Sequence, residues 1–234
     1  MSDEIKFETY ILINNDKFVI CVIKKSSSEI LFEEEKTYDN NKEISELDKL
    51  DDFLEKKIFK IEKILKNFIQ DVYIILKSKE FFPIGVSIKR ENYDNVIYQK
   101  NLIHPLNDLK NLCQFSYKDK KIIHMIIEKY CIDDKDYTIL PDNLKCDNFT
   151  LDIKFDCLPK KVIKNYEHIL KKYHILLNQV LNANYIEQYE DKTNQSIFHT
   201  AKLIVSGHNN NEVLLVNKTK RNKGFFEKFF DFFS

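Results

Sequence analysis

Residues 9–76 carry the pattern that most limits how this chain can fold. Three short apolar runs lie between residues 9 and 36, and the polar breaks between them suit hairpin loops, which predicts an antiparallel meander. After Ser45, a residue type that caps helices, apolar side chains recur every three or four positions over residues 47–68 and predict a long amphipathic helix. Residues 72–76 then indicate a buried strand. Together these elements predict an α+β half-domain in which the helix covers the sheet.

Residues 81–160 predict a second unit that is rich in strands. Over residues 148–157 apolar and polar side chains alternate strictly, which predicts a half-buried strand with one apolar face: Phe149, Leu151, Ile153, Phe155 and Cys157. Residues 121–131 predict another strand, which ends at the turn Asp133-Asp134-Lys135-Asp136. The remaining predicted elements are a short strand over residues 85–89 and a helix over residues 105–115 with Pro105 in its first turn.

The chain after residue 158 predicts further helices and strands around a polar break. The predicted elements are a helix over residues 159–172, a strand over 175–177, a helix over 181–189 and two strands over 201–205 and 212–216. The break covers residues 190–196, and residues 206–211, Ser-Gly-His-Asn-Asn-Asn, join the last two strands.

Composition excludes several classes of protein. The 37 basic and 37 acidic side chains cancel, so nothing in the net charge favours nucleic acid. Five cysteines, an odd number without a Cys-x-x-Cys pair, favour a reducing compartment and a role as small apolar core residues. The N-terminus is acidic and leads into no long apolar run, and no stretch approaches eighteen uninterrupted apolar residues. We therefore expect a cytosolic protein without a spanning segment.

Residues 224–234 form the most unusual stretch of the sequence. In a helix, its six Phe side chains would share an arc of roughly 160°, opposite the charged residues: Phe225, Phe226, Phe229, Phe230, Phe232 and Phe233. The residues just before it supply four cations, each attracted to anionic phospholipid by about 1 kcal/mol: Lys218, Lys220, Arg221 and Lys223. This combination predicts a helix that lies in a membrane surface. Two alternatives stay open, namely packing of the Phe stripe on the chain's own body and insertion into a partner's groove.

The energetics of this segment predict weak attachment by a single copy. A fully buried Phe contributes about 1.5–3 kcal/mol, whereas ordering each residue of so short a helix costs on the order of 1.5 kcal/mol. One copy should therefore bind reversibly, and stable attachment would need several copies held together, because linked copies gain from effective concentration.

The order of these elements, together with the C-terminal segment, resembles the bacterial actin-like cell-division family FtsA. Residues 61–76 look like the helix and strand that lead into that family's inserted 1C subdomain. Residues 122–133, which contain an Ile-His pair and end at an aspartate turn, are similar to a strand of the family. Residues 141–151 are similar to its proline-led loop and next strand, and Lys164-Asn165 to its exit helix. The resemblance covers roughly residues 8–190 and the C-terminal segment. It implies a partial actin-like (ribonuclease H-like) subdomain with an inserted 1C-like α/β subdomain that contacts other division proteins.

The chain departs from that family where a nucleotide would bind. Actin-type phosphate turns contain Gly, because only residues without a Cβ let backbone N–H groups approach phosphate closely. The first such turn is here Asn14-Asn15-Asp16-Lys17, and the second would be residues 206–211, which keep only Gly207. The sequence also leaves no room for most of the second lobe that closes on the nucleotide. We therefore expect no ATP binding, no hydrolysis and no cofactor.

Other candidate chemistry in the sequence is weaker. The six His residues show no metal-ligand spacing. His124 lies on a predicted buried strand, which favours a satisfied core histidine over a catalytic base, and Cys131 would point to the opposite face of that strand. Residues 133–136 lack the Gly and the closing Glu of a calcium loop, so no metal site is predicted. The acidic run 33–35 favours a solvated edge strand.

These observations predict four segments and one function. The segments are an actin-like 1A-type subdomain over residues 1–82, a 1C-like interaction subdomain over 83–160, a return to the first subdomain over 161–217, and a basic linker with a membrane-targeting helix over 218–234. The predicted protein is a non-catalytic cell-division adaptor, cytoplasmic and peripheral on the inner face of the cell membrane. Its predicted partners are anionic lipid and other cell-division proteins, with self-association left open and nucleic acid excluded. The alternative is a soluble interaction or structural protein.

Overall fold

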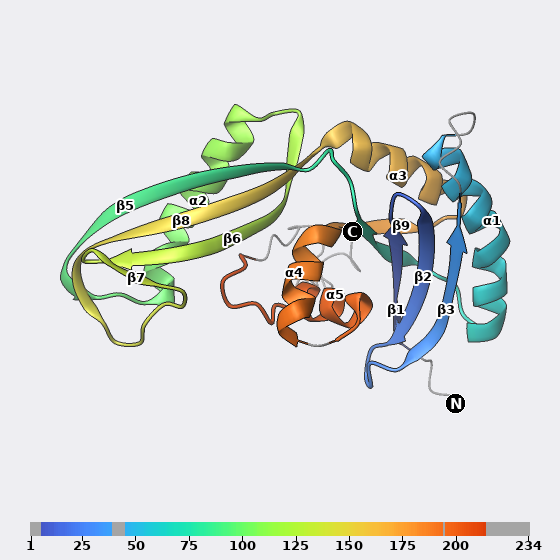
Figure 1. Ribbon diagram of the computed structural model, residues 1–234, viewed down its shortest axis with the longest axis horizontal. Coiled ribbons are helices and arrows are strands. Elements are labelled where there is room, and N and C mark those ends of the chain that lie inside the picture. Colours follow the sequence, from blue (N-terminus) through green and yellow to red (C-terminus); the bar gives the residue numbers. More distant parts are fainter. Residues whose placement is uncertain (1–5, 39–44, 194, 214–234) are drawn as a thin grey trace, which may run out of the picture.

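The computed structural model describes residues 6–38, 45–193 and 195–213, which form two sheets flanked by helices (Figure 1). The first sheet contains the strands β1 (Phe7–Ile13), β2 (Lys17–Lys24), β3 (Ile30–Thr37), β4 (Asp71–Leu76) and β9 (Leu176–Asn182). Their order is β3-β2-β1-β4-β9, and β2 alone runs antiparallel to the others. This mixed order is the ribonuclease H-like arrangement, so the predicted α+β class and the actin-like sheet are confirmed.

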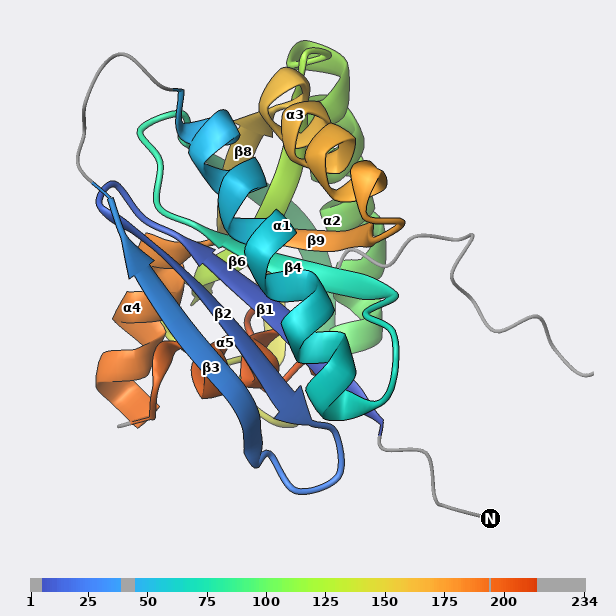
Figure 2. The ribbon, with the colours of Figure 1, turned by 90° about the vertical axis from the view of Figure 1, so that its right-hand side faces the viewer.

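Helices cover both faces of the first sheet. The helices α1 (Glu46–Leu65) and α3 (Lys160–Lys172) lie on one face, and α4 (Ala183–Thr193) and α5 (Ile197–Val205) lie on the other (Figures 1 and 2). Because successive side chains of a strand point to opposite faces, Ile11 and Ile13 pack with α1, whereas Tyr10 and Leu12 pack with α4 and α5. The first half of the molecule therefore has three layers.

The helix α1 begins where the sequence predicts. The Ser45 hydroxyl accepts a hydrogen bond from the Asp48 N–H at 3.2 Å. We expect Ser45→Ala to lower the free energy of unfolding by about 1 kcal/mol, because one N–H of the first turn loses its partner. Urea denaturation measures the change, with Ser26→Ala in an exposed turn as the control. Equal loss in both variants would contradict the capping role.

A second sheet is inserted between β4 and α3. It contains β5 (Phe82–Val96), β6 (Lys120–Ile132), β7 (Lys135–Tyr137) and β8 (Lys145–Pro159), in the antiparallel order β5-β8-β6-β7. The helix α2 (Gln99–Ser116) packs on one face of it. The alternation predicted for β8 is confirmed as far as Phe155, but Asp156, predicted on the polar face, is only 3% exposed. The five apolar residues are at most 3% exposed: Phe149, Leu151, Ile153, Phe155 and Cys157.

The helix predicted over residues 105–115 begins earlier than expected. It starts at Gln99, and Pro105 lies buried inside it rather than in its first turn. The Asn101 side chain accepts a hydrogen bond from the Tyr98 N–H at 2.9 Å, which stabilises this earlier start. Pro105 lacks the N–H that would bond to the Asn101 carbonyl, so the helix tolerates one missing bond.

The strand predicted over residues 201–205 is wrong, because these residues belong to helix α5. Ser196 is the N-cap of α5, with its side chain accepting from the His199 N–H. Phe198, Ala201 and Ile204 are spaced by three and bury one helical face against the first sheet. A short apolar run alone does not distinguish a strand from a helix.

The end of the described chain also differs from the prediction. Residues 206–211 follow a helix instead of joining two strands, so they do not occupy the place between two strands at which the family's second phosphate turn lies. Of the strand predicted over residues 212–216, Glu212 forms an isolated antiparallel bridge with Ile126, and residues 214–216 lie outside the described residues.

Several other elements are present with different ends. The strand predicted over residues 85–89 extends in both directions as β5, and that over 175–177 extends to Asn182 as β9. The helix expected over residues 181–189 reaches Thr193, so the polar break predicted at 190–196 is partly helical. β5 is longer than predicted because it pairs with β8 over most of its length.

The five cysteines lie in the described chain as free thiols. Four are buried, and Cys131 is partly exposed. Burial raises the pKa of Cys21 and of Cys157 to about 12, which disfavours the reactive thiolate. The prediction that these residues serve mainly as small apolar core residues is therefore confirmed for the four buried ones.

Candidate functional site

The ten residues predicted to bind the membrane lie outside the described residues. They are Lys218, Lys220, Arg221, Lys223, Phe225, Phe226, Phe229, Phe230, Phe232 and Phe233. Their role stays a prediction. Within residues 6–38, 45–193 and 195–213, no helix has both the length and the apolar content needed to cross a bilayer. The described chain offers two other features, a cleft at the ends of three strands and a buried histidine network.

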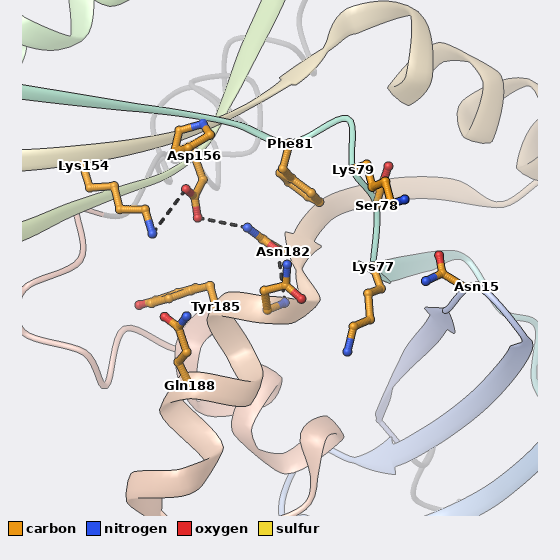
Figure 3. Close-up of a pocket in the computed structure, with 12 residues that line it drawn as sticks. Asn15, Lys77, Ser78, Lys79, Phe81, Lys154, Asp156, Asn182, Tyr185 and Gln188 are labelled. Carbon is orange, nitrogen blue, oxygen red and sulfur yellow. Dashed lines mark hydrogen bonds and ion pairs between the residues drawn. The ribbon is translucent and has the colours of Figure 1, made fainter.

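A cleft of about 560 Å³ opens at the carboxyl ends of the parallel strands β1, β4 and β9 (Figure 3). Its lining includes Asn15 after β1, residues 77–79 after β4 and Asn182 at the end of β9. Open α/β sheets bind ligands outside the carboxyl ends of their parallel strands. This strand-end cleft is therefore the position at which the fold can hold a ligand.

Two of the three lysines that line the strand-end cleft, Lys77 and Lys154, are in ion pairs, and the third, Lys79, is exposed. The Lys77 ammonium donates to both carboxylate oxygens of Glu187, at 2.8 and 2.9 Å. Asp156 accepts a hydrogen bond from the Asn182 amide at 3.1 Å and lies 3.6 Å from the Lys154 ammonium. An anionic ligand would have to compete with two existing ion pairs to use Lys77 and Lys154.

The turn between β1 and β2 is not built to hold phosphate. The Asn14 N–H donates to the Lys17 carbonyl at 3.0 Å, and the Asn15 N–H donates to the Asn14 side chain at 2.8 Å. The residues with positive φ in the described chain include none from 14–16. An anion-binding nest needs successive free N–H groups in alternating right- and left-handed conformations, so this turn lacks the required geometry.

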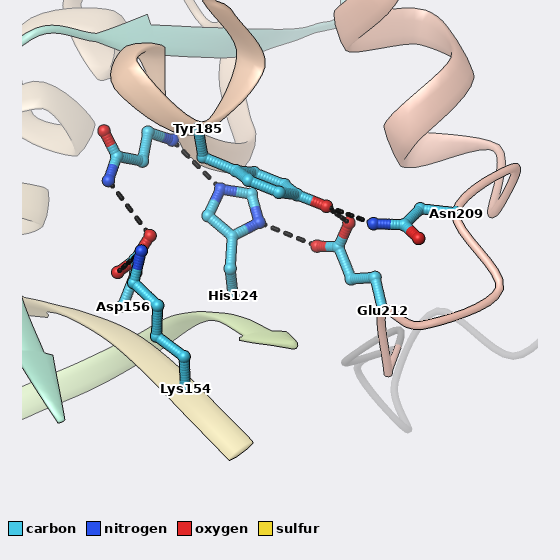
Figure 4. A network of polar contacts seen from close by, with 7 residues as sticks. His124, Lys154, Asp156, Tyr185, Asn209 and Glu212 are labelled. Atoms are coloured by element: carbon cyan, nitrogen blue, oxygen red, sulfur yellow. Dashed lines mark hydrogen bonds and ion pairs between the residues drawn. The ribbon is translucent and has the colours of Figure 1, made fainter. Parts of the chain in front are cut away.

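A hydrogen-bonded network around His124 lies beside the cleft (Figure 4). One ring nitrogen, Nδ1, lies 2.7 Å from a Glu212 carboxylate oxygen. The other Glu212 oxygen accepts from the Tyr185 hydroxyl at 2.8 Å, and that hydroxyl in turn accepts from Asn209 at 2.7 Å. The His124 and Glu212 side chains are only 0% and 4% exposed. Burial, and then the Glu212 charge, raises the pKa of Tyr185, which keeps its hydroxyl a donor.

The network leaves His124 without a free basic nitrogen. The Asn182 backbone N–H, which can only donate, lies 3.0 Å from Nε2. Nε2 is therefore the acceptor, and the proton of the neutral ring lies on Nδ1 and is donated to Glu212. The prediction of a satisfied core histidine is confirmed. The network joins β6 of the second sheet, the β9–α4 junction of the first sheet and the loop after α5.

The partners of His124 were not singled out from the sequence. Glu212 lies 88 positions from His124, and Asn182 lies 58 positions away. No local pattern reports contacts over such separations. The only signal was a histidine on a predicted buried strand, which requires buried partners somewhere in the chain.

The acidic turn after β6 is a structural turn, as predicted. Asp133 and Asp134 adopt positive φ angles, and the Asp133 carboxylate accepts from the Asp147 and Asn148 N–H groups at 3.1 and 3.0 Å. Among the described residues, no three His, Cys, Asp or Glu side chains are grouped so that they could hold a metal ion.

Comparison with known proteins yields structural similarity alone. No protein-family model and no curated protein sequence matches the chain. One similar structure is a PilM-PilN type IV pilus biogenesis complex, with a TM-score of 0.49 and 6% identity over 80% of this chain and 50% of that chain. Another is the cytoplasmic domain of EpsL, an inner membrane component of the type II secretion system of Vibrio cholerae, with a TM-score of 0.36 and 11% identity over 77% of this chain and 57% of that chain.

A third similar structure is a Bacteroides thetaiotaomicron protein with an actin-like ATPase fold and unknown function. Its TM-score is 0.38, with 15% identity over 82% of this chain and 60% of that chain. The present chain thus spans only part of the length of all three. None of the three is FtsA, so that resemblance stays a prediction. The fold is established by the strand order itself: the chain is an α+β protein with an actin-like, ribonuclease H-like sheet and a second sheet inserted after β4.

Proposed function

We propose that the chain is a non-catalytic adaptor at the inner face of the cytoplasmic membrane. In this proposal the folded body binds cell-division proteins, and the C-terminal segment binds anionic lipid. The observation that carries the non-catalytic assignment is the strand-end cleft. In its first turn the N–H groups of Asn14 and Asn15 are bonded internally, and two of its three lysines are already paired.

The buried histidine network supports the same conclusion. A general base needs a nitrogen with a free lone pair within reach of a substrate. His124 has no exposed surface, and the lone pair of Nε2 is directed at the Asn182 N–H. The network therefore stabilises the body instead of moving protons.

We expect isothermal titration of the intact chain with Mg-ATP to give no saturable heat. A cleft without an N–H nest would have to gain its affinity from its lysines, of which Lys77 and Lys154 are engaged in ion pairs and Lys79 is exposed to solvent. The matched variant is Lys77→Gln, which removes a cleft cation. Saturable heat that disappears in this variant would place a nucleotide in the cleft and overturn the non-catalytic assignment.

The membrane part of the proposal rests on the sequence of residues 218–234 and on the place of Val213, the last described residue. The Val213 N–H donates to the Met125 carbonyl at 2.8 Å, and the Ile127 N–H donates to the Asn211 carbonyl at 2.8 Å. Val213, the last described residue, is therefore held against β6. Vesicle co-sedimentation of the intact chain against a chain that ends at Asn222 tests the attachment, and equal binding by both would remove it.

A further inference from the structure

The outer edge of β5 differs from the other sheet edges in the described chain. An exposed edge strand presents unpaired N–H and C=O groups that can pair with another strand, and proteins block such edges with charges or short strands. β3 carries Glu34, which pairs with Lys57 and Lys60 of α1. β7 has three residues, and β9 has a bulge-like register shift at Asn178, between Leu177 and Gln179. Each of these edges has a feature that discourages pairing.

β5 lacks such a feature over its central residues. It pairs with β8 on one side and with no described strand on the other, and it forms one margin of the second sheet in Figure 1. Its register against β8 is continuous from Phe82 to Glu91. The central sequence, Ile84-Gly85-Val86-Ser87-Ile88, contains no charge and no Pro. These five residues, which lie between Pro83 and the charged run 89–91, are therefore an edge segment that is open to strand addition.

The apolar face of β5 is also incompletely covered. Ile84, Val86 and Ile88 pack at the margin of the core beneath α2 and remain partly exposed. The residues opposite them on β8, Phe155, Ile153 and Leu151, are at most 1% exposed. One further strand beside β5 would cover these three side chains, which would then be buried like the residues of β8, a strand with a neighbour on each side.

We propose that this strand is β5 of a second copy, paired antiparallel about a two-fold axis at Val86. The central sequence is self-complementary in this register, because Ile84 lies opposite Ile88 of the other copy and Gly85 lies opposite Ser87. Further out, Pro83 lies opposite Lys89, and Phe82 lies opposite Arg90, whose guanidinium already pairs with Asp108 of α2. An axis at Ser87 would set Ile84 against Arg90, and an axis at Gly85 would shorten the paired segment to residues 82–88.

The proposed dimer is compatible with the rest of the fold. Pairing residues of like face keeps both α2 helices on the same side of one continuous sheet, in an isologous contact. Ile84, Val86 and Ile88 all point toward α2. In the proposed dimer, each of these residues therefore lies opposite a residue of the other copy whose side chain is on the same face of the sheet. The contact is a single strand pair, smaller than a standard interface, so we expect dissociation in the micromolar range.

Sedimentation of the intact chain against Val86→Lys tests the proposal. The intact chain should dimerise in the micromolar range, and Val86→Lys should remain monomeric because two ammonium groups would meet on the axis. Leu112→Lys, the same kind of change at a 55% exposed residue of α2, should dimerise like the intact chain. A monomeric intact chain, or a dimeric Val86→Lys chain, would overturn the proposal.

A cross-linking experiment keeps the proposal falsifiable if Val86→Lys perturbs folding. Opposed Cβ atoms of an antiparallel pair lie about 4.5–5.5 Å apart, close to the separation within a disulfide. With diamide as the oxidant, Val86→Cys should form a disulfide-linked dimer that a reducing agent separates. Ser87→Cys, which would lie opposite Gly85 instead of itself, should cross-link much less. Cross-linking of Val86→Cys no better than that of the unaltered chain or of Ser87→Cys would exclude the axis at Val86.

Discussion

Removal of residues 223–234 should abolish co-sedimentation with anionic vesicles and leave the body folded. The deleted segment contains all six Phe residues of the apolar stripe, each able to contribute about 1.5–3 kcal/mol on burial. The described body supplies no spanning helix to replace them. Co-sedimentation with vesicles that contain phosphatidylserine measures the loss, and the unfolding midpoint of both chains checks the body.

Substitutions separate the two contributions to this binding. Phe229→Ala with Phe230→Ala should weaken binding to vesicles of any charge, whereas Phe115→Ala, on a 72% exposed ring of α2, should leave it unchanged. Replacing the four basic residues by Gln should cost about 1 kcal/mol per charge on anionic vesicles only, and added salt should mimic this change. A lowered unfolding midpoint without any loss of lipid binding would instead favour a segment that packs on the body.

His124→Ala should lower the free energy of unfolding by about 3–5 kcal/mol, because it leaves a buried carboxylate and a buried N–H without their partner. The carboxylate is that of Glu212, and the N–H is that of Asn182. The variant also leaves a cavity at a fully buried position. Urea or thermal denaturation of the intact chain measures the loss.

An exposed histidine provides the matched control for this prediction. His168→Ala on α3 should change stability by less than about 0.5 kcal/mol. Glu212→Gln should cost less than His124→Ala, because an amide oxygen still accepts from the ring. A cost for His124→Ala no larger than that of His168→Ala would show that the network does not join the two sheets energetically.

The sequence predicted those elements whose signals are local. The cap at Ser45 and the apolar repeat after it were sufficient to predict α1, and the alternation over residues 148–157 was sufficient to predict β8. Residues 201–205 carry no such local signal, because a five-residue apolar run fits the two-residue period of a strand as well as the 3.6-residue period of a helix. Tertiary packing of Phe198, Ala201 and Ile204 on the first sheet decides for a helix.

The candidate site was less predictable than the fold. The absence of Gly from residues 14–17 agrees with the geometry of this turn, which has no positive φ at residues 14–16 and an Asn14 N–H bonded to the Lys17 carbonyl. The network around His124 depends on contacts between β6, the end of β9 and the loop after α5, which only the complete fold brings together. Sequence periodicity carries no information on such contacts.

Residues 211–213 are hydrogen-bonded to β6, so they would bear a force applied to the C-terminal segment. Tension applied through the C-terminal segment would first meet the hydrogen bonds to Met125 and Ile127 and the Glu212 side chain. These groups lie where the inserted sheet adjoins the first sheet through His124 and Asn182. A pull from an anchored C-terminal segment would therefore be carried by the same residues that connect the inserted sheet to the first sheet.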